Sequence, residues 1–181
     1  MKPPRKYTSA AAFRVALENR LKRMAWDESL DLQRARRQAA FDRLLCRLFA
    51  GPDAPWLLKS GYALELRLKI ARTTRDIDLA LKRLPVPSGD WDANAPNVME
   101  ALREAGQLDL QDFFTFVFGD GEGMWHRGGH GEAFRRGRAI LQHVESVKVT
   151  IERRVSRTGS LTSRKLPDFP GIGNARPRFE I

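Results

Sequence analysis

The order of helical and strand patterns along the chain predicts an α+β domain, in which a small mixed sheet is flanked by helices. Three observations support this fold class. Residues 9–49 carry apolar side chains at helical spacing, residues 56–118 alternate short apolar runs with helical segments, and residues 120–181 are rich in glycine, arginine and serine. The 181 residues are enough for one domain with a sizeable core.

Two helices are predicted before residue 50. Thr8 and Ser9 can cap a helix over residues 10–25, whose apolar side chains repeat every three or four residues. A longer helix follows over residues 29–49, and Pro52 helps to end it. We expect its apolar side chains to face the core and its arginines to face mostly water. These arginines are Arg34, Arg36, Arg37 and Arg43.

A strand and a short helix come next. Residues 56–58 form a buried strand pattern, and residues 61–69 form a helical one. The leucine spacing predicts that Leu64 and Leu68 point inward and that Glu65 points outward.

The following segment completes the alternation. A second strand is predicted over residues 73–81, a loop over 85–96, a helix over 98–104 and a strand rich in Phe and Val over 112–118. Residues 144–151 could form a strand or a helix, because neither period is clean.

Composition divides the chain into three parts. Residues 1–8 are a basic lead that we expect to be disordered, and residues 9–119 form the folded core with its N-terminal helices. Residues 120–181 are an atypical tail rich in Gly, Arg and Ser, for which composition predicts irregular or disordered structure.

The composition also limits the class of protein. No run approaches the roughly 18 apolar residues of a membrane helix, and the N-terminus lacks the apolar core of a signal peptide. The single cysteine, Cys46, excludes an intramolecular disulfide and fits the reducing cytoplasm. Its neighbours Leu44, Leu45 and Leu48 predict a buried thiol.

The net charge of +10 favours a polyanionic partner such as RNA. Many of the arginines lie beside acidic residues in helical segments, so a solvated surface explains the same charge equally well.

Two carboxylates one residue apart stand in the second strand pattern. In a strand, residues i and i+2 point to the same face, so Asp76 and Asp78 would project together while Ile77 enters the core. Such a pair can hold Mg²⁺, which commonly binds one or two carboxylates together with substrate phosphates. Alternatively, both acids face solvent and form ion pairs with Arg72 or Arg75.

A small-residue turn precedes this strand. Ser60 and Gly61 open a helix, where exposed backbone N–H groups suit a phosphate, and the adjacent Lys59 could also approach one. Read with the carboxylates, the turn predicts a nucleoside triphosphate site.

These segments resemble the AbiEii/AbiGii family of nucleotidyltransferase-like toxins, the toxin halves of bacterial toxin–antitoxin and abortive infection systems. The first matching segment spans residues 58–64, with Ser60 where the family usually has its first glycine. The second spans residues 72–79, which include the Asp-x-Asp pair, and residues 112–116 also look similar. The resemblance covers roughly residues 8–119.

The resemblance implies transfer of a nucleotide from an NTP to a hydroxyl group, most plausibly of an RNA end or else of a protein. It implies Mg²⁺ held by Asp76 and Asp78, and an antitoxin encoded nearby as partner. In such a site, Ser60 and Gly61 would hold the phosphates, and Lys59 could approach them or extend its ammonium from the strand end into water. Arg75 and Arg72 could contact the triphosphate or the acceptor backbone, or pair with nearby acids.

The chain departs from the family pattern in two ways. Such enzymes use a third carboxylate on a later strand, for which Glu152 is a weak candidate and Glu145 a poorer one. The change of composition after residue 119 also suggests a truncated or frameshifted product. The alternative function is therefore an inactive remnant that binds nucleotide, RNA or antitoxin.

Overall fold

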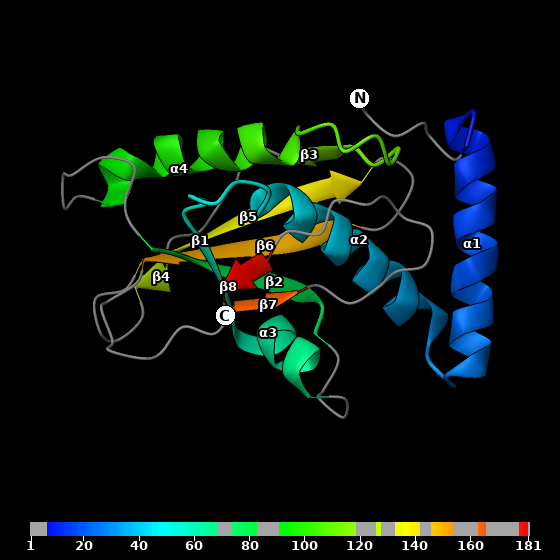
Figure 1. Cartoon of the computed structure of the whole chain (residues 1–181). Coiled ribbons are helices and arrows are strands. Elements are labelled where there is room, and N and C mark those ends of the chain that lie inside the picture. The colour runs from blue at the N-terminus through cyan, green and yellow to red at the C-terminus, as the bar shows by residue number, and fades with distance from the viewer. Residues whose placement is uncertain are drawn as a thin grey trace.

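The computed structural model has four helices and a mixed sheet within its described residues, which confirms the α+β class (Figure 1). Side chains are described for residues 7–68, 74–82 and 96–118. The described backbone covers residues 7–68, 74–82, 91–118, 126–127, 133–141, 146–153, 163–165 and 178–180.

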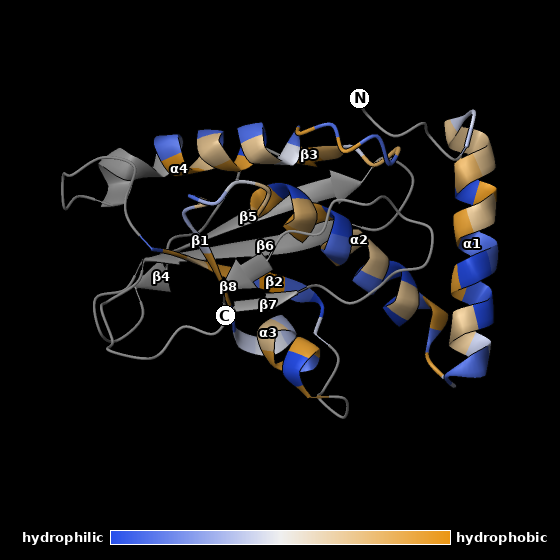
Figure 2. Ribbon diagram, viewed as in Figure 1, coloured by the Kyte–Doolittle hydropathy of each residue, from blue (hydrophilic) through white to orange (hydrophobic). Residues whose placement is uncertain are grey.

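The two N-terminal helices form close to where the sequence predicts them. Helix α1 (Ala10–Asp27) is capped by Ser9, whose hydroxyl accepts the Ala12 N–H at 3.2 Å. Helix α2 (Leu32–Leu48) is capped by Asp31, which accepts the Arg34 N–H at 3.0 Å. Figure 2 shows α1 with mixed hydrophobic and hydrophilic bands, as expected for a helix that buries one face.

The main sheet places its strands in the order β1-β2-β6-β5-β3, and β4 pairs with β5. Strand β2 runs antiparallel to β1 and parallel to β6, so the sheet is mixed. A separate pair, β7–β8, is antiparallel. The strands are β1 (Trp56–Lys59), β2 (Asp76–Leu81), β3 (Phe116–Phe118), β4 (His126–Arg127), β5 (Ala133–Leu141), β6 (Ser146–Arg153), β7 (Ser163–Lys165) and β8 (Arg178–Glu180).

The described part of residues 120–181 contributes strands β4 to β8. Three of them, β4, β5 and β6, join the main sheet, and β6 lies beside β2, so the sheet draws strands from both sides of residue 119. In β6, the apolar residues Val147, Val149 and Ile151 alternate with polar ones, and the segment forms a strand rather than a helix. The division into a core and a tail stays a prediction.

The main core lies between one face of the sheet and the helices α2 and α4 (Trp91–Gly106). Ile77 and Leu79 of β2 are fully buried there against apolar side chains of α2 and α4. A second cluster joins α1 to α2 around Phe13 and Leu21. Cys46 is 1% exposed, as predicted, and burial raises the pKa of its thiol to about 12.

The predicted boundaries of α4 and β3 differ most from the structure. Helix α4 begins at Trp91 and contains Pro96, so the loop predicted over residues 85–96 ends earlier than expected. Strand β3 begins at Phe116 rather than at residue 112, because Gln111 and Phe113 have φ of 56° and 62°, a left-handed conformation that a strand cannot contain.

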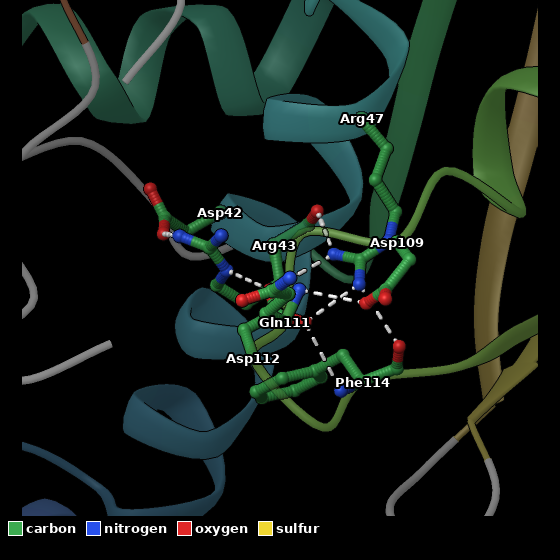
Figure 3. Close-up of polar contacts among 7 residues, drawn as sticks. All are labelled: Asp42, Arg43, Arg47, Asp109, Gln111, Asp112 and Phe114. Carbon is green, nitrogen blue, oxygen red and sulfur yellow. Dashed lines mark hydrogen bonds and ion pairs between the residues drawn. The ribbon is translucent and has the colours of Figure 1, made fainter. Parts of the chain in front are cut away.

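The loop before β3 is tied to α2 by a buried ion cluster of Arg43, Arg47 and Asp112 (Figure 3). Asp112 accepts hydrogen bonds from Arg43 Nε at 2.7 Å and from Arg47 Nη2 at 2.6 Å. Arg47 Nη2 also donates to the Phe114 carbonyl at 2.9 Å. The expectation that Arg43 faces mostly water is therefore wrong: it is 1% exposed, because its acidic partner lies far along the sequence, beyond the reach of helical periodicity.

Candidate active site

The carboxylate pair lies on β2 with the geometry of a half-buried strand. Asp76 and Asp78 are partly exposed, whereas Ile77 and Leu79 between and after them are fully buried. Alternation along the strand therefore puts both aspartates on the face opposite the α2 and α4 core. Carboxylate oxygens so placed can bind a hard divalent cation such as Mg²⁺.

The Ser60-Gly61 turn follows directly from the strand that pairs with β2. Lys59, the last residue of β1, is in register with Asp78, so the two positions lie opposite each other on neighbouring strands. Residues opposite each other in an antiparallel pair lie on one face, with Cβ atoms about 5 Å apart. The turn and the carboxylate pair thus meet at one end of the β1–β2 ladder.

Ser60 has a left-handed backbone, with φ of 55°. Glycine adopts this conformation at little cost, and serine does so with strain. This conformation gives a physical reason why a glycine would suit the position that Ser60 occupies. Ser60 is exposed, which leaves its hydroxyl and the turn accessible to a ligand.

Gly61 lies against the segment that leads into β2. A Cβ built on Gly61 would lie 3.0 Å from Thr74 Oγ1 and 3.1 Å from Thr74 Cβ, both tighter than ordinary contact. The missing side chain at residue 61 therefore allows Thr74 to approach the turn closely.

Helix α3 (Ser60–Arg67) corrects the predicted orientation of its side chains. Leu64 and Leu68 are 50% and 53% exposed, whereas Glu65 is buried at 9%. Glu65 turns inward because it accepts hydrogen bonds from Arg34 and Gln38 of α2. The leucine spacing gave no indication of this, because the partners of Glu65 lie on another helix.

The remaining predicted phosphate ligands differ in placement. Lys59 is half-buried at the end of β1, and Arg75 is exposed just before β2. Arg72 lies outside the described residues. In the sequence, Lys59 directly precedes the Ser60-Gly61 turn, and Arg75 directly precedes Asp76 of the carboxylate pair.

A third carboxylate does not appear among the described side chains, where no cluster of three or more metal-ligating residues occurs. The backbone register adds one observation: Thr150 of β6 is in register with Asp78, and Glu152 is in register with Ala80. The Glu152 position thus lies on the strand next to the carboxylate pair, two residues along from Asp78. Glu145 lies outside the described residues.

A separate hollow of about 310 Å³ lies between the C-terminal end of α2, the start of β1 and α4. Trp56, which lines it, is in register with Leu81, whereas the candidate site is at the Lys59–Asp78 end of the same ladder. The hollow is therefore distinct from the carboxylate site.

Comparison with protein families decides the membership of this chain. A family model described as nucleotidyl transferase AbiEii toxin, type IV toxin–antitoxin system, matches residues 43–171. The chain belongs to the AbiEii family. No curated protein matches it.

Membership in the AbiEii family confirms the resemblance seen in the motifs and makes the chain nucleotidyltransferase-like. The match begins within α2 and extends beyond residue 119, so it includes β5 and β6 as well as the turn and the carboxylate pair. Membership in a type IV toxin–antitoxin family also indicates an antitoxin partner. Within the described residues, no helix has the length and apolar character needed to cross a membrane.

Proposed function

We propose that this AbiEii-family chain transfers a nucleotide from an NTP to a hydroxyl group of RNA. The acceptor oxygen attacks the α-phosphorus, the bond from that phosphorus to the bridging oxygen breaks, and pyrophosphate leaves while the hydroxyl proton passes to solvent. For the second candidate acceptor, a protein hydroxyl, the same bonds form and break.

Asp76 and Asp78 are the residues that hold Mg²⁺ in this proposal. When bound, the ion neutralises triphosphate charge and polarises the reacting oxygens. The backbone N–H groups of Ser60 and Gly61 and the Ser60 hydroxyl bind phosphate oxygens, which fixes the α-phosphorus relative to the carboxylates. Lys59 and Arg75 add positive charge along the triphosphate.

The observation that carries this proposal is the register of Lys59 with Asp78. This register brings together a turn of the type that binds phosphate and a carboxylate pair. In the sequence, the rest of α3 lies between these two segments. If Asp76 and Asp78 only formed ion pairs at the surface, there would be no reason for such a turn to lie beside them. The net charge of +10 is weaker support for an RNA acceptor than this register. Arg34, Arg43 and Arg47 form ion pairs within the protein, so their charges do not serve to bind RNA.

The test is transfer of label from each α-labelled NTP to total RNA or total protein, with Mg²⁺ present. Asp78→Asn should lower the rate by about 100-fold or more, because it removes a metal ligand. Chelation of Mg²⁺ should abolish transfer. Asp53→Asn, which changes an exposed carboxylate before β1, is the matched control and should transfer label as the wild type does.

Digestion of the labelled product by ribonuclease or protease identifies the acceptor. Transfer that persists in Asp78→Asn contradicts the metal assignment. A folded wild-type chain that transfers no label with any NTP leaves the alternative, a non-catalytic remnant that binds nucleotide, RNA or antitoxin. We further propose that the protein acts in the cytoplasm, where NTPs, RNA and a co-expressed antitoxin are present.

A further inference from the structure

Glu65 is a buried carboxylate that links three separate segments of the chain. It belongs to α3, and its side chain is 3% exposed in its ion pair with Arg34 of α2. Gln38, one helical turn further along α2, donates to the same carboxylate. The Thr74 N–H, just before β2, donates to it as well.

The two oxygens of Glu65 have different partners. Oε1 accepts hydrogen bonds from Arg34 Nε at 3.0 Å and from Gln38 Nε2 at 2.9 Å, and it forms an ion pair with Arg34 Nη2 at 2.9 Å. Oε2 accepts the Thr74 N–H at 3.1 Å. The donors on α2 therefore hold the carboxylate in one orientation, in which its second oxygen faces the segment that leads into β2.

Thr74, which Glu65 holds in place, is in turn hydrogen-bonded to the backbone of Asp76, the first residue of the carboxylate pair. Its hydroxyl donates to the Asp76 carbonyl at 3.2 Å and lies 3.4 Å from the Asp76 N–H. The same Thr74 side chain packs on Gly61, where a Cβ would be only 3.0 Å from its oxygen. Thr74 thus contacts both the turn and the first residue of β2.

We propose that Glu65 is a positioning residue, which fixes the start of β2 against the Ser60-Gly61 turn so that Asp76 and Asp78 face a phosphate bound there. This inference rests on the proposed function for the use of that geometry. Glu65 does not itself contact the phosphate or the reacting atoms. It acts through Thr74.

The chemistry of the contacts makes one variant especially informative. In Glu65→Gln, the donors Arg34 and Gln38 require an oxygen at the Oε1 position. The amide nitrogen then faces the Thr74 N–H, so two donors oppose each other and this hydrogen bond is lost. The variant is nearly isosteric and keeps the contacts with α2.

Two variants serve as matched controls. Gln38→Met removes one donor to Oε1 but leaves the Thr74 N–H bonded to Oε2. Glu18→Gln changes a carboxylate of α1 that pairs with another α2 arginine, Arg36, at a place remote from β2.

The first measurement is amide hydrogen exchange in the full chain, which requires no enzymatic activity. In Glu65→Gln, the Thr74 amide should exchange at least about tenfold faster than in the wild type, because its hydrogen bond to a charged acceptor is lost. The Asp76 amide, which donates to the Thr74 hydroxyl, should also exchange faster, because Thr74 is no longer held by Glu65. Amides in the middle of α2 should keep their wild-type exchange, as should all these amides in both controls.

The second measurement is binding of Mn²⁺, used as the probe ion. Glu65→Gln should weaken Mn²⁺ binding by about tenfold, as loss of a supporting partner of metal ligands commonly does. Label transfer should fall mainly in kcat, because the carboxylates are displaced while the turn that binds the NTP is retained. A residue that only stabilised the fold would not change metal affinity in the folded protein.

The outcomes separate the two proposals. Wild-type exchange at Thr74 and Asp76 in Glu65→Gln, or wild-type Mn²⁺ binding in that variant, overturns the positioning role and leaves the proposed function intact. Equal Mn²⁺ binding by the wild type and Asp78→Asn overturns the metal site of the proposed function instead. The exchange measurement then still decides whether Glu65 fixes the start of β2.

Discussion

At the scale of single residues, the left-handed conformation of Ser60 means that one substitution should affect stability and NTP binding in opposite directions. Its φ of 55° is strained for serine, and a glycine there would remove the strain but lose more entropy on folding. We expect Ser60→Gly to raise the free energy of unfolding by up to about 1 kcal/mol, measured by urea denaturation. The same change removes a proposed phosphate ligand, so the KM for NTP should rise.

Ser29 provides the matched control for this prediction. It also has a left-handed backbone, with φ of 52°, but lies in the connection between α1 and α2. Ser29→Gly should give a similar gain in stability with an unchanged KM. A lower KM in Ser60→Gly would contradict a role for its hydroxyl in phosphate binding.

At the scale of secondary-structure elements, the cluster of Arg43, Arg47 and Asp112 fastens the loop before β3 to α2. All three side chains are nearly inaccessible to solvent, at 2% exposed or less. Removing one member of a buried ion cluster leaves an uncompensated charge. We expect Asp112→Asn to lower the free energy of unfolding by about 3 kcal/mol, a large part of the roughly 5–15 kcal/mol of a typical domain.

The pair of Glu18 and Arg36 between α1 and α2 gives the comparison for Asp112. Its side chains are 31% and 27% exposed, so water screens their charges. Glu18→Gln should cost less than about 1 kcal/mol in the same urea experiment. Equal costs for the two variants would mean that burial does not control the strength of these ion pairs.

The elements also show what the sequence could predict. Local patterns correctly predicted the Ser9 cap, the alternation of buried residues in β2 and the presence of α1 and α2, because these depend on neighbours within a few residues. Tertiary partners decided the rest. Glu65 meets Arg34 from 31 positions away, and Asp112 meets Arg43 from 69 positions away, so no periodicity within one helix could show that these charges are buried.

In the candidate site, too, the local motifs could be predicted from the sequence and the tertiary contacts could not. The Asp-x-Asp pair and the Ser60-Gly61 turn are local motifs, and the order of residues alone is enough to recognise them. Their proximity follows from the register of β1 with β2, which the sequence does not contain. The contribution of Thr74 was missed because a threonine before a strand has no distinctive pattern.

At the scale of the whole molecule, the buried side chains of Asp112 and Cys46 are expected to set the acid and alkaline ends of the pH range in which the protein is most stable. Burial alone would raise the pKa of Asp112, but hydrogen bonds from Arg47 and the charges of Arg47 and Arg43 lower it below its usual value. Its contribution to stability is therefore present above about pH 4, the pKa of an unfolded aspartate, and is lost as the pH falls through the lower folded pKa. Cys46 acts in the opposite range, since burial raises the pKa of its thiol to about 12.

The alkaline limit follows from the sign of the Cys46 shift. Above about pH 8.5 the unfolded chain forms a thiolate while the folded chain keeps the thiol, so unfolding is favoured by about 1.4 kcal/mol for each further pH unit until the folded pKa is reached. Urea denaturation between about pH 3 and 10 should therefore show a plateau with falling stability at both ends. Cys46→Ala should flatten the decline between about pH 9 and 10, and Asp112→Asn should flatten the decline below about pH 4. An unchanged alkaline slope in Cys46→Ala would show that another group, such as the buried Tyr62, whose pKa burial also raises, sets that limit.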